Sequence, residues 1–260
     1  MIVCRSRTGL ANRIFCIINS IYICKKFSIE ELYIVWDQNN HLPCQFTDIF
    51  NLSFPYKIIP DTHPSGYFIC HNYPQSPWNN IEHWEKNINK HLIEQSYKPY
   101  DFITCEEIRE LFSYLNFSKN IIDTYENKYL SYENFYCCHL RFGDLLSCLE
   151  VNINKDDIIK SIPNDCLVFT DDDSIYRQYP FLKRIDSGEF PKIISGNQIS
   201  RSTNSIFFSV ISLLIMINSR GLIIWTPPSS FSFLAKVLSS NDEIKCQIGN
   251  TKIPYIKYDI

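Results

Sequence analysis

Hydrophobic positions at the start of the chain form two short runs separated by one long periodic segment. Ile2-Val-Cys4 predicts a short strand, residues 11–26 predict an apolar helix, and Leu32-Tyr-Ile-Val-Trp36 predicts a second strand. This order favours a pair of parallel strands. Residues 37–100 contain many proline turns and few periodic segments, so we interpret them as an irregular insert that faces a substrate. Residues 105–129 return to a helical pattern.

The second half of the chain repeats a strand, a polar loop and a helix three times. Its strands are predicted at residues 135–141, 166–170 and 222–226, and each is apolar enough to lie in a sheet that is covered on both faces. Ligands of such sheets bind beyond the carboxyl ends of the strands. The pattern therefore predicts an α/β fold with parallel sheets and two Rossmann-like halves, residues 1–130 and 131–260.

The charge of the chain favours no polyanionic partner. Its 25 basic residues stand against 28 acidic ones, which gives a net charge of −3. This balance produces no overall field that would attract nucleic acid or an anionic membrane. We expect neither partner, so any phosphate group must be bound by a local site.

Three further features indicate a cytoplasmic protein. The longest apolar stretch, residues 205–217, is too short to span a membrane, because a span takes about 20 residues. The amino terminus lacks the long apolar segment of a secretory signal. The eleven cysteines contain no Cys-x-x-Cys pair and several stand inside apolar runs, so we interpret them as buried thiols of a reducing compartment.

The segment His139-Leu-Arg-Phe-Gly-Asp144 carries the first candidate chemistry, at the end of a predicted strand. Side chains alternate along a strand, so His139 and Arg141 share one face, and Gly143 permits the turn that brings Asp144 round. The guanidinium of Arg141 offers the fork of donors that a diphosphate needs, and His139 suits binding of a phosphate or support of the loop. The alternative is that Arg141 and Asp144 form a surface ion pair and that His139 packs in the core.

Two later loops contain further candidate ligand-binding residues at the carboxyl ends of their predicted strands. Ser229 or Ser230 is placed to cap a helix, so the loop through Phe231 and Ser232 would present backbone N–H groups and the positive end of the helix dipole to a phosphate. A plain capped helix is the alternative. The run Asp171-Asp-Asp173 suits binding of a base or ribose, ligation of a metal, or the start of a helix.

Another loop lies in the first half of the chain, between the first strand and the first helix. It contains Gly9, Asn12 and Arg13, which face the same kind of crevice. This loop is not a P-loop, since no Gly-Lys-Ser/Thr follows, and it is not a Gly-x-Gly-x-x-Gly fingerprint of dinucleotide-binding proteins.

These motifs, in this order, resemble those of the fucosyltransferase superfamily, which includes α-1,2-, α-1,6- and protein-O-fucosyltransferases and the rhizobial nodulation fucosyltransferase. The superfamily's Gly-x-Gly-Asn-Arg/Gln motif is matched by Gly9-Leu-Ala-Asn12-Arg13, and its His-x-Arg-Arg-x-Asp motif by His139-Leu-Arg-Phe-Gly-Asp144. Its strand ending in Thr-Asp and its late Ser-x-Phe-Ser segment look like Thr170-Asp171 and Ser229-Ser-Phe-Ser232. Residues 37–134 match no motif of the superfamily.

The resemblance implies a GT-B fold of two facing Rossmann-like domains, with the acceptor on the first domain and the donor held mainly by the second. It implies an inverting transfer of fucose or a related sugar to a hydroxyl of a glycan, with no metal or other cofactor. Arg141 would stabilise the departing nucleoside diphosphate. Asp144 and Asp37 are candidates for the base that takes the acceptor proton. The residues expected to bind the donor are Gly9, Asn12, Arg13, His139, Arg141, Asp171, Ser229, Ser230, Phe231 and Ser232.

Two departures from the superfamily's pattern bear on the donor. Phe142 stands where many relatives have a second arginine, and Ala11 replaces the second glycine. A GDP-linked sugar is the favoured donor, and a UDP-linked sugar remains open. Two other functions also remain open: a metal-dependent glycosyltransferase that uses Asp171-Asp-Asp173, and a non-catalytic protein that binds nucleotide sugars.

Overall fold

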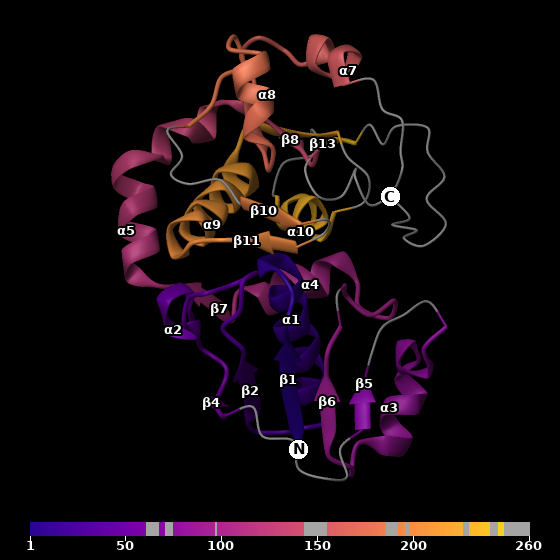
Figure 1. The fold of residues 1–260 in the computed structure, drawn as a ribbon. Helices are drawn as coiled ribbons and strands as arrows, with labels where there is room; N and C mark the ends of the chain where they lie inside the picture. Colours follow the sequence, from indigo (N-terminus) through magenta and orange to yellow (C-terminus); the bar gives the residue numbers. More distant parts are fainter. Residues whose placement is uncertain are drawn as a thin grey trace. The chain divides into compact units, whose positions relative to one another are not determined.

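The computed structural model shows two compact units, residues 1–118 and residues 119–260 (Figure 1). It describes residues 1–60, 68–70, 75–96, 98–142, 155–185, 192–195, 198–225, 229–239 and 244–246. Each unit is built on a parallel sheet. Residues 143–154, which include Asp144, and residues 226–228 lie outside the described residues.

The first unit has a sheet of five parallel strands in the order β4-β2-β1-β6-β5. A second, antiparallel pair joins β3 to β7. The strands are β1 (Ile2–Ser6), β2 (Leu32–Trp36), β3 (Phe50–Leu52), β4 (Tyr56–Ile58), β5 (Phe68–Cys70), β6 (Leu92–Glu94) and β7 (Leu115–Phe117). The helices are α1 (Leu10–Lys26), α2 (Phe46–Ile49), the 3-10 helix η1 (Pro77–Asn79), α3 (Ile81–Asn87) and α4 (Cys105–Phe112).

Helix α1 covers the middle of this sheet, over β1 in Figure 1. Most of its side chains are buried, so it packs between the sheet and α4. Its first turn follows the end of β1, and its last turn carries Lys25 and Lys26, whose charges stabilise the negative end of the helix dipole. Because α1 runs antiparallel to the strands, its amino terminus lies at the carboxyl edge of the sheet.

The interpretation of residues 37–100 as an irregular insert was wrong, because β4, β5 and β6 lie in this segment and complete the sheet. Each of these strands has only three residues, too few to show a period of two in the sequence. The helical pattern of residues 105–129 is also interrupted, because β7 separates α4 from the next helix and pairs with β3.

The second unit has a sheet of four parallel strands in the order β13-β12-β8-β9, and β10 and β11 form a separate antiparallel pair. Its strands are β8 (Tyr136–Leu140), β9 (Leu167–Thr170), β10 (Lys192–Ser195), β11 (Gln198–Ser200), β12 (Gly221–Trp225) and β13 (Ile244–Cys246). Its helices are α5 (Lys119–Lys128), the 3-10 helix η2 (Leu130–Asn134), α7 (Lys155–Ser161), α8 (Asp173–Gln178), α9 (Thr203–Asn218) and α10 (Ser230–Leu238). The strands predicted in this half are confirmed as β8, β9 and β12.

The boundary between the units follows Ser118, whereas the sequence pattern placed it at residue 130. The difference is helix α5, which packs on α9 and η2 of the second unit. Packing on these elements assigns α5 to the second unit, although it continues the helical pattern of the first half.

The strand order of each sheet reverses at one point. In the first unit β1 is followed along the chain by β2 on one side and later by β6 on the other, so the reversal lies between β1 and β6. In the second unit the corresponding reversal lies between β8 and β12. Open parallel sheets bind ligands at such points, beyond the carboxyl ends of the strands.

Within the described residues, no helix is both long enough and apolar enough to cross a membrane. Cysteines whose side chains are described are free thiols, and all of them except Cys105 are buried. Burial raises the pKa of several of these thiols, including Cys24 and Cys44, so they remain protonated and pack as small apolar side chains.

Candidate active site

Strand β8 separates its side chains between two faces. Cys138, Leu140 and Phe142 are buried in an apolar cluster with residues of α7, β9 and α8. His139 and Arg141 therefore lie on the opposite face, as the alternation in the sequence predicts. Phe142, which stands in place of a superfamily arginine, is thus a core residue here.

Arg141 forms an ion pair with Asp171 just beyond the sheet. Leu140 on β8 is paired in register with Thr170 on β9, so the next residue of each strand leaves the sheet at the same level. Arg141 Nε lies 3.2 Å from Asp171 Oδ2, and the two side chains are only 20% and 9% exposed. Asp171 therefore holds the guanidinium of Arg141 at the edge where a ligand would bind.

His139 supports the helix that follows β12. Its Nδ1 lies 2.6 Å from the hydroxyl oxygen of Ser232, and its ring packs against Phe231 with centroids 5.4 Å apart. Burial, together with the charge of Arg141, lowers the pKa of His139 to about 3. The imidazole is therefore neutral near pH 7, and it links the first turn of α10 to β8.

The amino terminus of α10 presents uncapped backbone groups next to β8. Ser229 is the N-cap residue in extended backbone, but its side chain makes no capping hydrogen bond within the described part of the chain. The backbone N–H groups of Ser230, Phe231 and Ser232 belong to the first turn, where no carbonyl of the same helix can accept from them. This geometry suits an anion better than it suits a closed cap.

The three consecutive aspartates have three different partners. Asp171 pairs with Arg141, whereas Asp172 is the N-cap of α8 and lies 3.3 Å from Lys155 Nζ. Asp173 pairs with Arg177 at 3.3 Å along α8. Their carboxylates do not converge, and among the described residues no group of three His, Cys, Asp or Glu side chains is arranged to hold a metal ion.

In the first unit, Arg13 forms hydrogen bonds with the two loops that follow β1 and β2. Its Nε donates to the carbonyl oxygen of Thr8 at 2.8 Å and its Nη2 to that of Asp37 at 2.7 Å, while the guanidinium lies 4.6 Å from the ring centroid of Trp36. Burial lowers the pKa of Arg13 to about 10, so the side chain stays charged at neutral pH. Arg13 is fully buried, and its contacts shape the loops rather than line an open surface.

Gly9 and Asn12 lie at the start of α1. Gly9 is its N-cap residue and accepts from the backbone N–H of Arg13 at 3.1 Å. The Asn12 side chain is half-buried and forms no hydrogen bond with another described residue. Asn12 is therefore the residue of the amino-terminal motif that is best placed to meet a ligand.

A second Arg–Asp pair in the first unit was missed from the sequence. Ser6 on β1 is in register with Trp36 on β2, so the next residues, Arg7 and Asp37, leave the sheet side by side. Arg7 Nε lies 3.2 Å from Asp37 Oδ2, and the side chains are 53% and 32% exposed. The same construction recurs in the second unit with Arg141 and Asp171, and the aspartate follows the arginine by the same interval in both. That repeated interval is the signal that would have revealed both pairs.

A buried carboxyl group, that of Glu94, has no signal in the sequence pattern. Glu94 ends β6, beside the reversal point of the first sheet. Its Oε1 accepts from the backbone N–H of Ser96 at 2.9 Å and from Asn19 Nδ2 at 3.4 Å, and its Oε2 accepts from the hydroxyl of Tyr100. Burial raises the pKa of Glu94 to about 7.

We expect Glu94 to make the stability of the protein depend on pH. An unfolded chain holds this proton only below about pH 4.3, whereas the folded protein holds it up to about pH 7. The contribution of protonated Glu94 to the free energy of unfolding is therefore complete below about pH 4.3 and is lost as the pH rises through about 7. In the wild type the free energy of unfolding should fall by on the order of 3 kcal/mol over this pH range. Glu94→Gln replaces the carboxyl group with a neutral isostere and should therefore remove most of this fall.

Urea unfolding between pH 4 and pH 8 measures this effect. Glu85→Gln, which changes an exposed carboxylate on α3, is the control and should retain the wild-type profile. An unchanged pH profile in Glu94→Gln would show that another group is responsible.

No protein-family model matches the chain, and no curated protein sequence matches it. Solved structures do match. NodZ α-1,6-fucosyltransferase co-crystallised with GDP, a protein of Bradyrhizobium, superposes with a TM-score of 0.57 over 91% of each chain at 15% identity. The chain has the fold of the fucosyltransferase superfamily.

Two other solved fucosyltransferase-type structures support the same fold. POFUT1 in complex with GDP superposes with a TM-score of 0.53 over 96% of this chain and 98% of its own, at 11% identity. A point mutant of Arabidopsis thaliana FUT1 in complex with GDP also has a TM-score of 0.53, over 95% of this chain and 69% of its own, at 13% identity. The predicted α/β fold with parallel sheets is confirmed, and the inferred resemblance is confirmed as a likeness of fold.

Proposed function

We propose that this protein is a glycosyltransferase that moves fucose or a related sugar from a nucleoside diphosphate to a hydroxyl of a glycan. GDP is the favoured nucleoside diphosphate, since three solved proteins of similar fold were crystallised with GDP. In this proposal the second unit binds most of the donor and the first unit binds the acceptor.

The position of Arg141 is the strongest support for this function. It stands at the carboxyl end of β8, at the reversal point of the sheet, and Asp171 orients it. The first turn of α10, which has no side-chain cap among the described residues, follows the neighbouring strand β12, and the contact between His139 and Ser232 links that turn to β8. A guanidinium and a helix amino terminus at one sheet edge form a site for a diphosphate.

Arg141 would act most strongly as the bond to the sugar breaks. The diphosphate gains negative charge when it leaves the anomeric carbon, and a fixed cation stabilises that charge more than it stabilises the bound donor. This is the task that a metal ion performs in other transferases. We therefore propose a transfer without a metal, in which His139, Ser229, Ser230, Phe231 and Ser232 shape the phosphate site.

The acceptor hydroxyl would attack the anomeric carbon from the face opposite the diphosphate, which inverts the configuration. Its proton must pass to a base, and Asp37 and Asp144 remain the proposed candidates. Asp37 stands at the end of β2, where its carboxylate is one-third exposed and paired with Arg7. In the same unit Gly9 and Asn12 would contact the donor, and Arg13 would position their loop through Thr8 and Asp37.

Two assays with the purified full chain test this function. A thermal-shift screen compares GDP, UDP and their sugars, because a ligand present at 100 times its Kd stabilises the folded state by about 2.7 kcal/mol. We expect GDP and GDP-fucose to raise the melting temperature most. Slow release of GDP from GDP-fucose, in the presence of a chelator, should then identify an active transferase that needs no metal.

The outcomes separate the three candidate functions. Donor cleavage that stops with chelator and returns with Mg²⁺ or Mn²⁺ would favour the metal-dependent transferase. Tight binding of a nucleotide sugar without any cleavage or transfer would favour a non-catalytic binding protein. If neither GDP, UDP nor any of their sugars raises the melting temperature, the proposed donor site is contradicted.

A further inference from the structure

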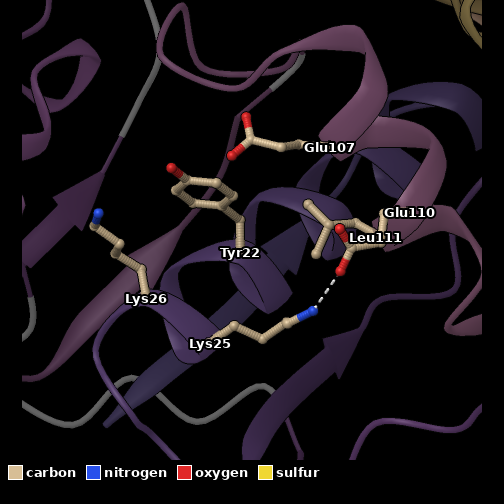
Figure 2. Close-up of a pocket in the computed structure, with 6 residues that line it drawn as sticks. All are labelled: Tyr22, Lys25, Lys26, Glu107, Glu110 and Leu111. Atoms are coloured by element: carbon tan, nitrogen blue, oxygen red, sulfur yellow. Dashed lines mark hydrogen bonds and ion pairs between the residues drawn. The ribbon is translucent and has the colours of Figure 1, made fainter.

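A pocket of about 310 Å³ lies on the first unit between α1 and α4. Figure 2 shows its lining, with side chains from the last turns of α1 on one side and side chains of α4 on the other. Tyr22 precedes the end of α1 by about one turn, so it lies about 15 Å along the helix from Asn12. The pocket is therefore well separated from the strand-end loops of this unit.

One end of the pocket is lined by the ion pair between Lys25 and Glu110. Lys25 Nζ donates to Glu110 Oε1 at 2.8 Å and to the hydroxyl of Tyr114 at 3.1 Å. These contacts satisfy the charges of Lys25 and Glu110 against each other. A ligand gains little by displacing them, so the other end of the pocket is the part with binding capacity.

That other end consists of Tyr22, Lys26 and Glu107, and in Figure 2 the Tyr22 ring lies between the other two side chains. Lys26 is exposed and makes no ion pair with another described residue. Glu107 uses Oε2 to accept from the backbone N–H of Thr104 at 2.8 Å, which fixes the position of its carboxylate. An ammonium and a carboxylate thus flank an aromatic ring, with no net charge.

The Tyr22 ring packs at the end of a row of aromatic side chains. It packs on Phe102 with centroids 5.6 Å apart, Phe102 stacks on Tyr100 at 5.1 Å, and Tyr100 meets the buried Trp84 at 5.6 Å. Tyr22 is the outermost ring of this row and is half-buried. A fixed aromatic ring of this kind binds a partner at low entropic cost.

We propose that this pocket is a subsite for a neutral saccharide, a remote unit of the acceptor glycan. Sugar rings carry polarised C–H groups that pack on the negative face of an aromatic ring, and their hydroxyls can donate to Glu107 and accept from Lys26. The balanced charge of the lining favours an uncharged ligand, and the volume, near the lower end of about 300–1,000 Å³ for ligand sites, suits one or two sugar rings. The proposal rests on the proposed function, since only a glycan acceptor gives the subsite a role.

Binding of fluorescently labelled protein to a printed array of neutral oligosaccharides, followed by titration of the best one, tests this proposal. We expect Tyr22→Ala to weaken that affinity about tenfold, as for loss of a central aromatic contact, and Tyr22→Phe to retain it to within about twofold. The matched control is Tyr132→Ala, because Tyr132 is a half-buried tyrosine of the second unit that also packs on a neighbouring ring. Each variant must first show the wild-type melting temperature.

Three results would overturn the proposal: no binding of any neutral oligosaccharide, unchanged affinity in Tyr22→Ala, or binding of sulfated glycans alone through Lys26. A thermal shift with GDP in the same preparations keeps the two questions apart. If GDP raises the melting temperature but Tyr22→Ala leaves the oligosaccharide affinity unchanged, the subsite is contradicted and the proposed function is not. Absence of the shift contradicts the proposed function itself.

Discussion

Replacing Arg141 with alanine is expected to lower kcat for sugar transfer on the order of a thousandfold, as removal of a preorganised group that stabilises transition-state charge does. The loss should fall on kcat more than on KM for the acceptor, because the guanidinium acts mainly on the charge of the departing diphosphate. Arg141→Lys keeps the charge but loses the two-pronged geometry, and it should retain only part of the activity. Steady-state kinetics with GDP-fucose measures these effects.

This experiment needs a control for folding, because Arg141→Ala leaves the nearly buried carboxylate of Asp171 without its ion-pair partner. An unpaired buried charge is destabilising. The double variant Arg141→Ala/Asp171→Asn removes that charge and should be as inactive as the single variant but better folded. Arg177→Ala, which removes an exposed arginine of α8, should keep wild-type kinetics. Normal turnover in a folded Arg141→Ala protein would contradict the role assigned to this residue.

The substitution Phe142→Arg, which would complete the Arg-Arg pair of the motif that this segment resembles, is expected to unfold the second unit rather than to improve donor binding. The Phe142 side chain is buried with Leu140, Ile159 and Ile175, and Lys155 Nζ lies 5.4 Å from its ring centroid. Loss of a buried phenylalanine alone costs about 3–5 kcal/mol, and the new cation would lie unpaired in an apolar cluster beside Lys155. Domains of ordinary stability have about 5–15 kcal/mol in total.

Chemical denaturation of Phe142→Arg and Phe142→Leu measures this cost. The leucine variant preserves an apolar side chain of smaller size and should lose roughly 1–2 kcal/mol. A Phe142→Arg protein of wild-type stability would place residue 142 on the ligand side of β8. It would then overturn the assignment of His139 and Arg141 to the opposite face.

The sequence alone predicted the elements that show a clear period or a long apolar run. The first β-α-β unit, the strands β8, β9 and β12, and the division of β8 into two faces follow from alternation and helical spacing. The start of α10 at Ser229 or Ser230 was predicted from the preference of serine for N-cap positions, and Ser229 is the N-cap residue, although its side chain makes no capping hydrogen bond with a described residue. Each of these features depends on residues that are close together in the sequence, so short sequence patterns can predict it.

Features that depend on pairing between distant segments could not be predicted in this way. The strands β4, β5 and β6 have three residues each and exist because the sheet provides partners. The partner of Arg141 depends on the register between β8 and β9, so the ion pair with Asp171 cannot be predicted from either strand alone. The buried state of Arg13 and the protonation of Glu94 depend on what the tertiary fold packs around them.

Calorimetric titration of the wild-type protein and Arg141→Ala with GDP and with GMP tests most directly whether Arg141 holds the diphosphate. We predict that the wild type binds GDP more tightly than GMP and that Arg141→Ala loses roughly 10- to 100-fold in GDP affinity, the cost of one or two charge-assisted hydrogen bonds. GMP affinity should change little. Equal GDP affinity in the two proteins, or no binding of GDP by the wild type, would contradict the role of Arg141 in binding the diphosphate.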